Sequence, residues 1–197
     1  LTVIDPQGEQ VADLLAFRRD DIDDGDGLRI GSNYFDLAMI MDYWGEKRLN
    51  HHTEATTMLY GARECARLML EEGLEPRYHR HRRAGAAMTS GLRALGLTVF
   101  GDDRHRMTNV TAATIPDGVD GENVRRRMRE DFEIEIGTAF GPLAGKVWRF
   151  GAMGYNARKH KVLLTLGALE AVLRAEGFAC PAGEAVPAAL AAWDATA

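Results

Sequence analysis

The chain has 197 residues, of which 46% are hydrophobic and 27% charged, and its formal net charge is -5. This length suits one domain with a sizeable core, or one domain and an appendage, and the composition is ordinary for a globular protein. The acidic balance argues against a general nucleic-acid binder, and no apolar run approaches the roughly 20 residues that a membrane-spanning helix needs.

The first 32 residues differ in character from the rest of the chain. Residues 1–17 predict two short strands around a turn, and residues 20–27 form an acidic loop. This loop does not fit a calcium-binding EF-hand, because Ile22 falls at a ligand position and Gly31 where the glutamate is required. The amino-terminal residues do not resemble a secretory signal, and the two cysteines form no CxxC motif, so we expect a cytoplasmic protein with reduced thiols.

Three helices are predicted between residues 35 and 95. A short apolar run predicts the first over residues 35–44, which Gly45 ends. The second helix, over residues 56–72, has apolar residues at spacings of three and four, namely Leu59, Ala62, Ala66 and Met69. The third runs over residues 76–95, with proline in its first turn and glycine after its end.

Strands and helices alternate in the second half of the chain. Apolar runs predict strands at residues 97–100, 110–115, 134–136 and 147–150, with a helix over residues 122–132. Asn156 is expected to cap a final helix with the apolar stripe Val162, Leu166, Leu169 and Leu173. This order predicts an α+β fold, in which helices cover a small, mostly antiparallel sheet.

Asn50, His51, His52 and Thr53 come shortly before the helix over residues 56–72. The unpaired N–H groups at a helix N-terminus suit a phosphate, and a threonine hydroxyl could donate a further hydrogen bond. The alternative is structural: a threonine caps the helix, and the histidines are packed or solvated. Adjacent histidines are poor ligands for one metal, and no further ligand stands at zinc-like spacing, so no metal site is predicted.

Arg149 lies in the otherwise apolar run Val147-Trp148-Arg149-Phe150. A buried arginine needs a charged partner, and its planar guanidinium suits bidentate recognition of a carboxylate. The alternative is an edge strand with the arginine turned to solvent.

Two helices carry clusters of arginines, at residues 77–83 and 125–129. Either cluster could contact phosphate or nucleic acid. However, the arginines spread around each helix and acidic residues lie close by, which favours solvated faces. We therefore expect no nucleic-acid partner.

Several segments together resemble the fold-type I, class V aminotransferases of the alanine–glyoxylate and serine–pyruvate kind. The resemblance rests on Tyr43-Trp44-Gly45, His51-His52-Thr53, Met58-Leu59-Tyr60, Phe132-Glu133-Ile134-Glu135-Ile136-Gly137, Gly141-Pro142, Gly145-Lys146-Val147-Trp148-Arg149-Phe150-Gly151 and Met153-Gly154-Tyr155-Asn156-Ala157. It covers about three-quarters of the chain, in order and at plausible spacing. It implies four regions: a hairpin of different origin (1–32), the end of the large domain with its interface helix (33–75), the small carboxy-terminal domain (76–177) and a tail (178–197).

The resemblance implies roles for three residues in a homodimeric, pyridoxal-5'-phosphate-dependent enzyme. Arg149 matches the arginine that binds the substrate carboxylate, and Thr53 matches a residue that reaches the cofactor phosphate of the neighbouring subunit. Asn50 stands where alanine–glyoxylate enzymes usually have tyrosine, which is similar to the (S)-ureidoglycine–glyoxylate aminotransferases of purine breakdown. An amide could read the ureido group, because it both donates and accepts hydrogen bonds.

One departure from the family concerns catalysis. The family's large domain carries the lysine that forms the Schiff base, and none of the four lysines here stands in that motif. We therefore expect that this chain alone does not catalyse transamination. Three functions stay open: the ureidoglycine–glyoxylate activity, an alanine– or serine–glyoxylate activity, and a non-catalytic remnant or interaction module. The helix over residues 56–72 is expected to expose apolar surface and to promote association.

The opening run of residues 3–17 has a separate resemblance. It is similar to the first hairpin of the urea-carboxylase-associated family, which is related to nitrogen metabolism. A fusion, a truncated gene or a chimaeric assembly would each explain a junction near residues 31–33.

Overall fold

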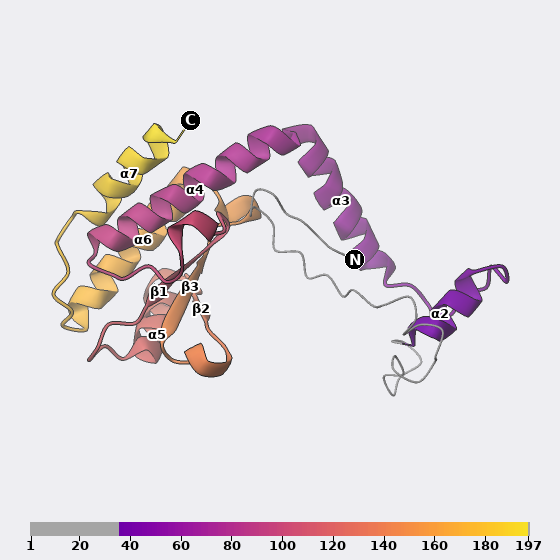
Figure 1. Cartoon of the computed structure of the whole chain (residues 1–197), viewed down its shortest axis with the longest axis horizontal. Helices are drawn as coiled ribbons and strands as arrows, with labels where there is room; N and C mark the ends of the chain where they lie inside the picture. The colour runs from indigo at the N-terminus through magenta and orange to yellow at the C-terminus, as the bar shows by residue number, and fades with distance from the viewer. Residues whose placement is uncertain (1–35, 197) are drawn as a thin grey trace. The chain divides into compact units, whose positions relative to one another are not determined.

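A computed structural model describes residues 36–196, which form two compact units that meet in sequence between Glu71 and Glu72 (Figure 1). The hairpin expected for residues 1–32 lies outside the described residues. Within the described range, no helix is both long enough and apolar enough to cross a membrane. The same residues contain no group of three or more His, Cys, Asp or Glu side chains that could hold a metal ion.

The first unit consists of two helices and the loop that joins them. Helix α2 (Leu37–Trp44) begins after Asp36, whose carboxylate accepts a hydrogen bond of 2.9 Å from the Met39 amide. Helix α3 (Thr56–Glu72) has the bounds that the apolar spacing predicts. Neither helix has a buried residue. The expected exposure of apolar side chains on α3 is therefore present: Met58, Tyr60 and Leu70 are 76%, 71% and 78% exposed.

The second unit is built on a three-stranded antiparallel sheet in the order β1-β3-β2. Its strands are β1 (Val110–Thr114), β2 (Gly137–Thr138) and β3 (Val147–Gly151). With the helices around it, the sheet confirms the predicted α+β class. Two predicted strands are wrong. Residues 97–100 contribute only the isolated bridge from Val99 to Ala113, and residues 134–136 are not a strand.

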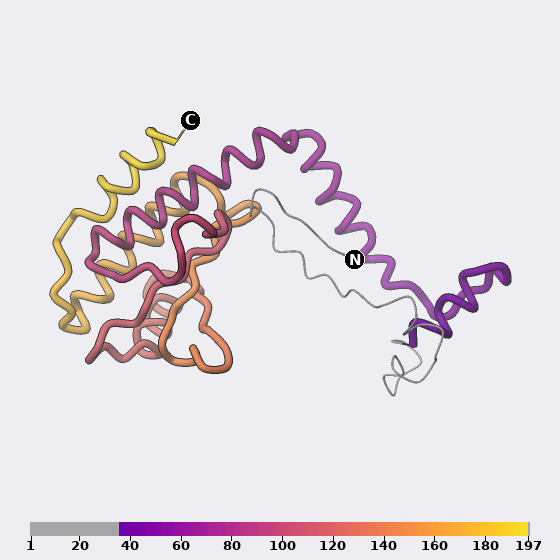
Figure 2. The backbone as a smooth tube through the Cα atoms, viewed as in Figure 1, coloured from indigo at the N-terminus to yellow at the C-terminus, as the bar shows by residue number. Residues whose placement is uncertain are grey.

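Four helices surround this sheet: α4 (Leu74–Ala94), α5 (Gly121–Phe132), α6 (Lys159–Ala175) and α7 (Ala185–Ala195). Helices α4, α6 and α7 pack against one another, and α5 packs against α6 (Figures 1 and 2). The core between them is fully apolar at its centre, with Trp148, Leu92 and Leu166 at 0% exposure. Gly91 permits the close approach of α4 to α6, because a Cβ there would lie 2.3 Å from Leu166 Cδ1.

The carboxy-terminal end corrects two expectations. The tail at residues 178–197 contains α7, which buries Ala185, Ala189 and Trp193 at successive spacings of four. Asn156 does not cap α6. It ends the short 3-10 helix η4 (Gly154–Asn156), and the residue before α6 is Arg158, which makes no side-chain cap.

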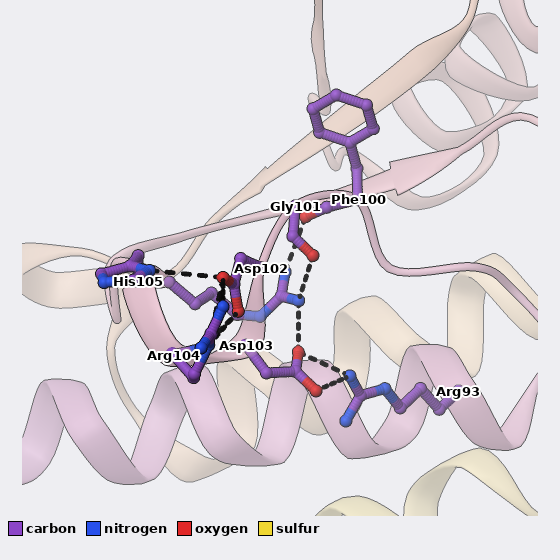
Figure 3. A network of polar contacts seen from close by, with 8 residues as sticks. Arg93, Phe100, Gly101, Asp102, Asp103, Arg104 and His105 are labelled. Carbon is purple, nitrogen blue, oxygen red and sulfur yellow. Dashed lines mark hydrogen bonds and ion pairs between the residues drawn. The ribbon is translucent and has the colours of Figure 1, made fainter.

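An ion-paired network closes the connection between α4 and β1 (Figure 3). The network surrounds the 3-10 helix η2 (Asp103–His105). Asp103 accepts hydrogen bonds from Arg93, at 2.7 Å to each carboxylate oxygen, and from Arg106. These arginines hold the pKa of Asp103 below its usual range through hydrogen bonds, first from Arg106 and then from Arg93. The network ties the loop to α4 at an exposed place.

Candidate carboxylate-binding site

Arg149 lies in the middle of β3, the central strand of the sheet. Its neighbours Trp148 and Phe150 point into the core and are 0% and 1% exposed, whereas Arg149 points the other way and is exposed. The Trp148 indole N–H donates to the Gly121 carbonyl at 3.1 Å, which fixes the strand against the start of α5. The alternative of an edge strand is therefore wrong, although the arginine does face outward.

The antiparallel register places one hydrogen-bond partner beside Arg149. Gly137 of β2 stands opposite Arg149, and the next residue, Thr138, accepts a hydrogen bond of 2.6 Å from Arg149 Nε through its carbonyl. The guanidinium carbon lies 5.0 Å from the centroid of the Phe140 ring, which is a cation–π contact. These two contacts fix the plane of the guanidinium.

The terminal nitrogens of Arg149 are unpaired within residues 36–196. In the described part of the chain, neither of them has a hydrogen-bond partner and no carboxylate forms an ion pair with Arg149. A guanidinium with its Nε anchored and its two Nη atoms unpaired can bind one carboxylate through two parallel hydrogen bonds.

Sequence reasoning identified Arg149 but missed Thr138 and Phe140. The Thr138 carbonyl is a backbone atom, so only the strand register could reveal it. Phe140 directly precedes Gly141-Pro142 and is 76% exposed. An aromatic residue beside a Gly-Pro turn in the loop before the arginine strand was the available signal.

The structure places Asn50 and Thr53 in the first unit, in the loop between α2 and α3. Both are exposed, and within the described residues neither side chain makes a hydrogen bond. Thr53 therefore does not cap α3, whose first residue Thr56 donates its backbone N–H to the Glu54 carbonyl at 2.8 Å.

The two histidines of this loop are packed against α2. His51 meets Tyr43 edge-on with ring centroids 5.3 Å apart, and His52 lies 5.8 Å from Trp44. Their Nδ1 atoms are 2.9 Å apart, so one histidine donates to the other. Their packing agrees with the structural interpretation. One atom, His51 Nε2, is buried without a hydrogen-bond partner.

The arginines of α5 are ion-paired. Arg125 contacts Glu122 and Glu135, and Arg126 and Arg129 both contact Glu130. Arg127 binds Asp131 and Glu176. These ion pairs agree with the predicted solvated face.

None of the four lysines, all of which lie within residues 36–196, is buried. Lys47 lies 2.6 Å from Asp42, which raises the lysine pKa through a hydrogen bond, and Lys159 lies 2.8 Å from Asp194. Lys146 is exposed, and Lys161 stands 5.8 Å from the Tyr155 ring as a cation–π partner.

No protein-family model matches the chain, but individual proteins do. It is similar to the (S)-ureidoglycine–glyoxylate transaminase of Bacillus subtilis (strain 168), with 57% identity over 161 residues that cover 82% of this chain and 39% of that protein. Alanine–glyoxylate aminotransferase of Callithrix jacchus is 38% identical over 147 residues, which cover 73% of this chain and 36% of that protein. The crystal structure of ureidoglycine–glyoxylate aminotransferase from Bacillus subtilis aligns with a TM-score of 0.76 and 56% identity, over 83% of this chain and 42% of that one. The chain thus spans about two fifths of the length of the curated relatives that it matches.

Proposed function

Because the chain corresponds in sequence and fold to the carboxy-terminal portion of a class V aminotransferase, we propose that it supplies the carboxylate-binding part of an enzyme that transfers an amino group to glyoxylate. The amino donor in this proposal is (S)-ureidoglycine, as the name of the 57% identical relative suggests. Pyridoxal phosphate, when bound, would supply the electron sink for the transfer. The chain's own residues bind and orient the substrate.

Arg149 carries the proposal. Its two free Nη atoms pair with the substrate carboxylate, while the Thr138 carbonyl and the Phe140 ring keep the guanidinium from rotating. A ligand held at its carboxylate by two parallel hydrogen bonds has a fixed direction, which brings its reacting carbon to one place. Thr53 donates its hydroxyl to the cofactor phosphate, and the Asn50 amide binds the ureido group of the donor.

The Arg149 role is tested by adding glyoxylate to the purified chain and following the Arg149 Nε–H resonance by NMR. We expect a saturable shift, with the Nε–H signals of the ion-paired Arg126 and Arg127 unchanged. Arg149→Lys keeps the charge but not the two-point geometry, and it should weaken binding roughly tenfold. An equal shift with the uncharged analogue glycolaldehyde, or unchanged affinity in Arg149→Lys, would overturn the role.

The choice of donor depends on Asn50. N-carbamoylglycine carries both a ureido group and a carboxylate, and alanine carries only the carboxylate. Under the proposal, Asn50→Ala weakens binding of N-carbamoylglycine and leaves alanine binding unchanged. Equal effects on the two ligands would instead favour the alternative, an alanine– or serine–glyoxylate activity.

Dimer formation through α3 is part of the same proposal. Its support is the absence of any buried residue on α3 together with the exposed Met58, Tyr60 and Leu70.

The alternative, a non-catalytic remnant or interaction module, is tested by mixing the chain with pyridoxal phosphate and recording its absorption before and after borohydride reduction. A reducible band assigned by peptide mass to one lysine would contradict our reading of the four lysines.

A further inference from the structure

The carboxyl end of β3 is held by a turn that the proposed function does not use. Strand β3 ends at Gly151, and the turn runs through η4 to Ala157 before α6 begins at Lys159. Gly154 starts the turn with a φ of +56°, a left-handed conformation that favours glycine. The turn links β3, the strand that carries Arg149, to α6.

Arg80 of α4 binds this turn through its backbone. Its Nη1 donates to the carbonyls of Gly154, at 2.7 Å, and Ala157, at 3.1 Å. On its other side Arg80 makes a two-point contact with Glu72, whose carboxylate also accepts from Arg77. The charge of Arg80 is thus neutralised by Glu72, while its Nη1 alone bonds both carbonyls of the turn.

His81, the next residue, makes the complementary contact. Its Nδ1 lies 2.7 Å from the Arg77 carbonyl, and the Gly154 N–H lies 3.1 Å from its Nε2. A carbonyl can only accept and a backbone N–H can only donate, so the partners fix the neutral tautomer with hydrogen on Nδ1. A proton on Nε2 would place two donors face to face, break this hydrogen bond and leave the Gly154 amide unpaired.

The surroundings of His81 oppose that proton. Burial lowers the pKa of His81 most, and the charges of Arg80 and Arg77 lower it further. The Arg77 carbonyl and the Glu72 carboxylate act in the opposite direction. From the turn, the group that faces the ring is the Gly154 backbone N–H.

We propose that Arg80 and His81 are positioning residues for the arginine strand: together they fix the turn after β3, and protonation of His81 breaks one of the three hydrogen bonds that hold it. The hydrogen bonds from Arg80 hold the carbonyls of the turn, and His81 holds its first amide. Loss of the His81 contact loosens the turn at Gly154, five residues after Arg149 in the sequence, while the Arg80 contacts remain. The consequence for carboxylate binding rests on the proposed function of Arg149.

The pH dependence has a defined sign. The pKa of His81 is lower in the folded chain than its ordinary value of 6.5, so the unfolded state takes up the proton first as pH falls. The contact is fully present above that ordinary value. It is lost as pH falls below 6.5 and through the lowered pKa of the folded state.

The test compares hydrogen exchange at Gly154 with the titration of His81 in the full chain. Long-range nitrogen NMR of the imidazole should show hydrogen on Nδ1 at about pH 8, and protection of the Gly154 amide should fall roughly tenfold as pH is lowered through the measured midpoint of His81. His81→Gln keeps an acceptor that does not titrate, so its Gly154 protection should not change with pH. His79→Gln, an exposed histidine on the same helix, is the matched control and should behave like the wild type.

The outcomes separate the two proposals. Hydrogen on Nε2 at about pH 8, constant protection through the His81 titration, or a pH step that persists in His81→Gln would each overturn the inference. Failure of glyoxylate to shift Arg149 in the wild type would overturn the proposed function, while the Gly154 readout would still decide the inference. If glyoxylate binds, its affinity should fall with Gly154 protection as pH decreases in the wild type but not in His81→Gln. If glyoxylate affinity changes with pH in the same way in the wild type and in His81→Gln, the proposed link between the turn and Arg149 is overturned.

Discussion

Helices α3 and α6 both have 17 residues, yet they differ in what they bury. Helix α6 buries six side chains, namely Val162, Leu166, Ala168, Leu169, Val172 and Leu173, whereas α3 buries none. Both show apolar residues at helical spacing, and the sequence predicted the bounds of α3 correctly. Local spacing therefore identifies a helix and its apolar face, but the surface that covers this face is a property of the rest of the assembly.

The comparison separates two kinds of stability. The unit from Glu72 onward has its own core and should unfold cooperatively. Helix α3 has little besides its own hydrogen bonds and exposed ion pairs such as Arg67 with Glu64 and Glu71, which contribute little. Its order should depend on a partner surface.

The largest expected difference lies between matched leucines of the two helices. Leu166 is 0% exposed and Leu70 is 78% exposed. Leu166→Ala leaves a cavity and should lower the free energy of unfolding by about 2–5 kcal/mol, whereas Leu70→Ala should change it by less than about 0.5 kcal/mol. Urea unfolding followed by tryptophan fluorescence measures both. Equal losses would mean that α3 contributes to the same core.

Substitutions on α3 should affect self-association more than substitutions on α6, the reverse of their effects on unfolding. We expect the chain to associate through the apolar face of α3, so a charge at Leu59, which is 56% exposed, should weaken the association. Leu59→Lys should raise the dissociation constant roughly tenfold, a change of about 1.4 kcal/mol. Leu164→Lys is the control, because Leu164 is 53% exposed but lies on α6. Sedimentation velocity over a concentration series measures both variants, and a monomer in the wild type would contradict the prediction.

The sequence predicted more of the helices than of the sheet. Residues 134–136 read as a strand, but the Ile134 N–H donates to the Met128 carbonyl after Glu133 turns left-handed with a φ of +57°. The end of α5 thus uses the donor that a strand would need. Residues 98–100 run beside β1, where the Phe100 N–H donates to the Ala112 carbonyl, but they form only a single bridge.

Helix α7 and the surroundings of Arg149 show two further limits of the sequence. Ala185, Ala189 and Trp193 recur every four residues, but alanine is common on exposed faces too, so their burial was not evident. The proposal that Arg149 binds a carboxylate came from its residue type and from a family resemblance. Its anchors, the Thr138 carbonyl and the Phe140 ring, depend on strand register and loop conformation, which the residue types alone do not specify.

Helix capping offers a smaller test of the same contrast. Asp120 accepts hydrogen bonds from the amides of Glu122 and Asn123 at 3.1 and 3.0 Å, at the start of α5 in the second unit. Asp120→Ala should therefore lower the free energy of unfolding by about 1 kcal/mol. Asp36 caps α2 in the first unit, and Asp36→Ala should leave the main transition in place. The measurement is the urea midpoint of unfolding for Asp120→Ala and for Asp36→Ala. If Asp36→Ala shifts the midpoint as much as Asp120→Ala does, α2 unfolds together with the core.

An effect of similar size is expected at Glu72, the last residue of α3 and a member of the second unit, where Arg77 and Arg80 pair with its carboxylate. Hydrogen bonds from Arg80 lower the pKa of Glu72 from 4.5 to about 2, so its contribution is fully present above 4.5 and is lost as pH falls through about 2. Because the side chain is still 28% exposed, we expect Glu72→Gln to cost about 1 kcal/mol at neutral pH and nothing near the lowered pKa. Glu71→Gln is the matched control, since Glu71 is 67% exposed and pairs only with Arg67 among the described residues. Urea unfolding of the three proteins across this pH range measures the difference. If Glu71→Gln and Glu72→Gln behave alike, the end of α3 is as independent of the core as the rest of that helix.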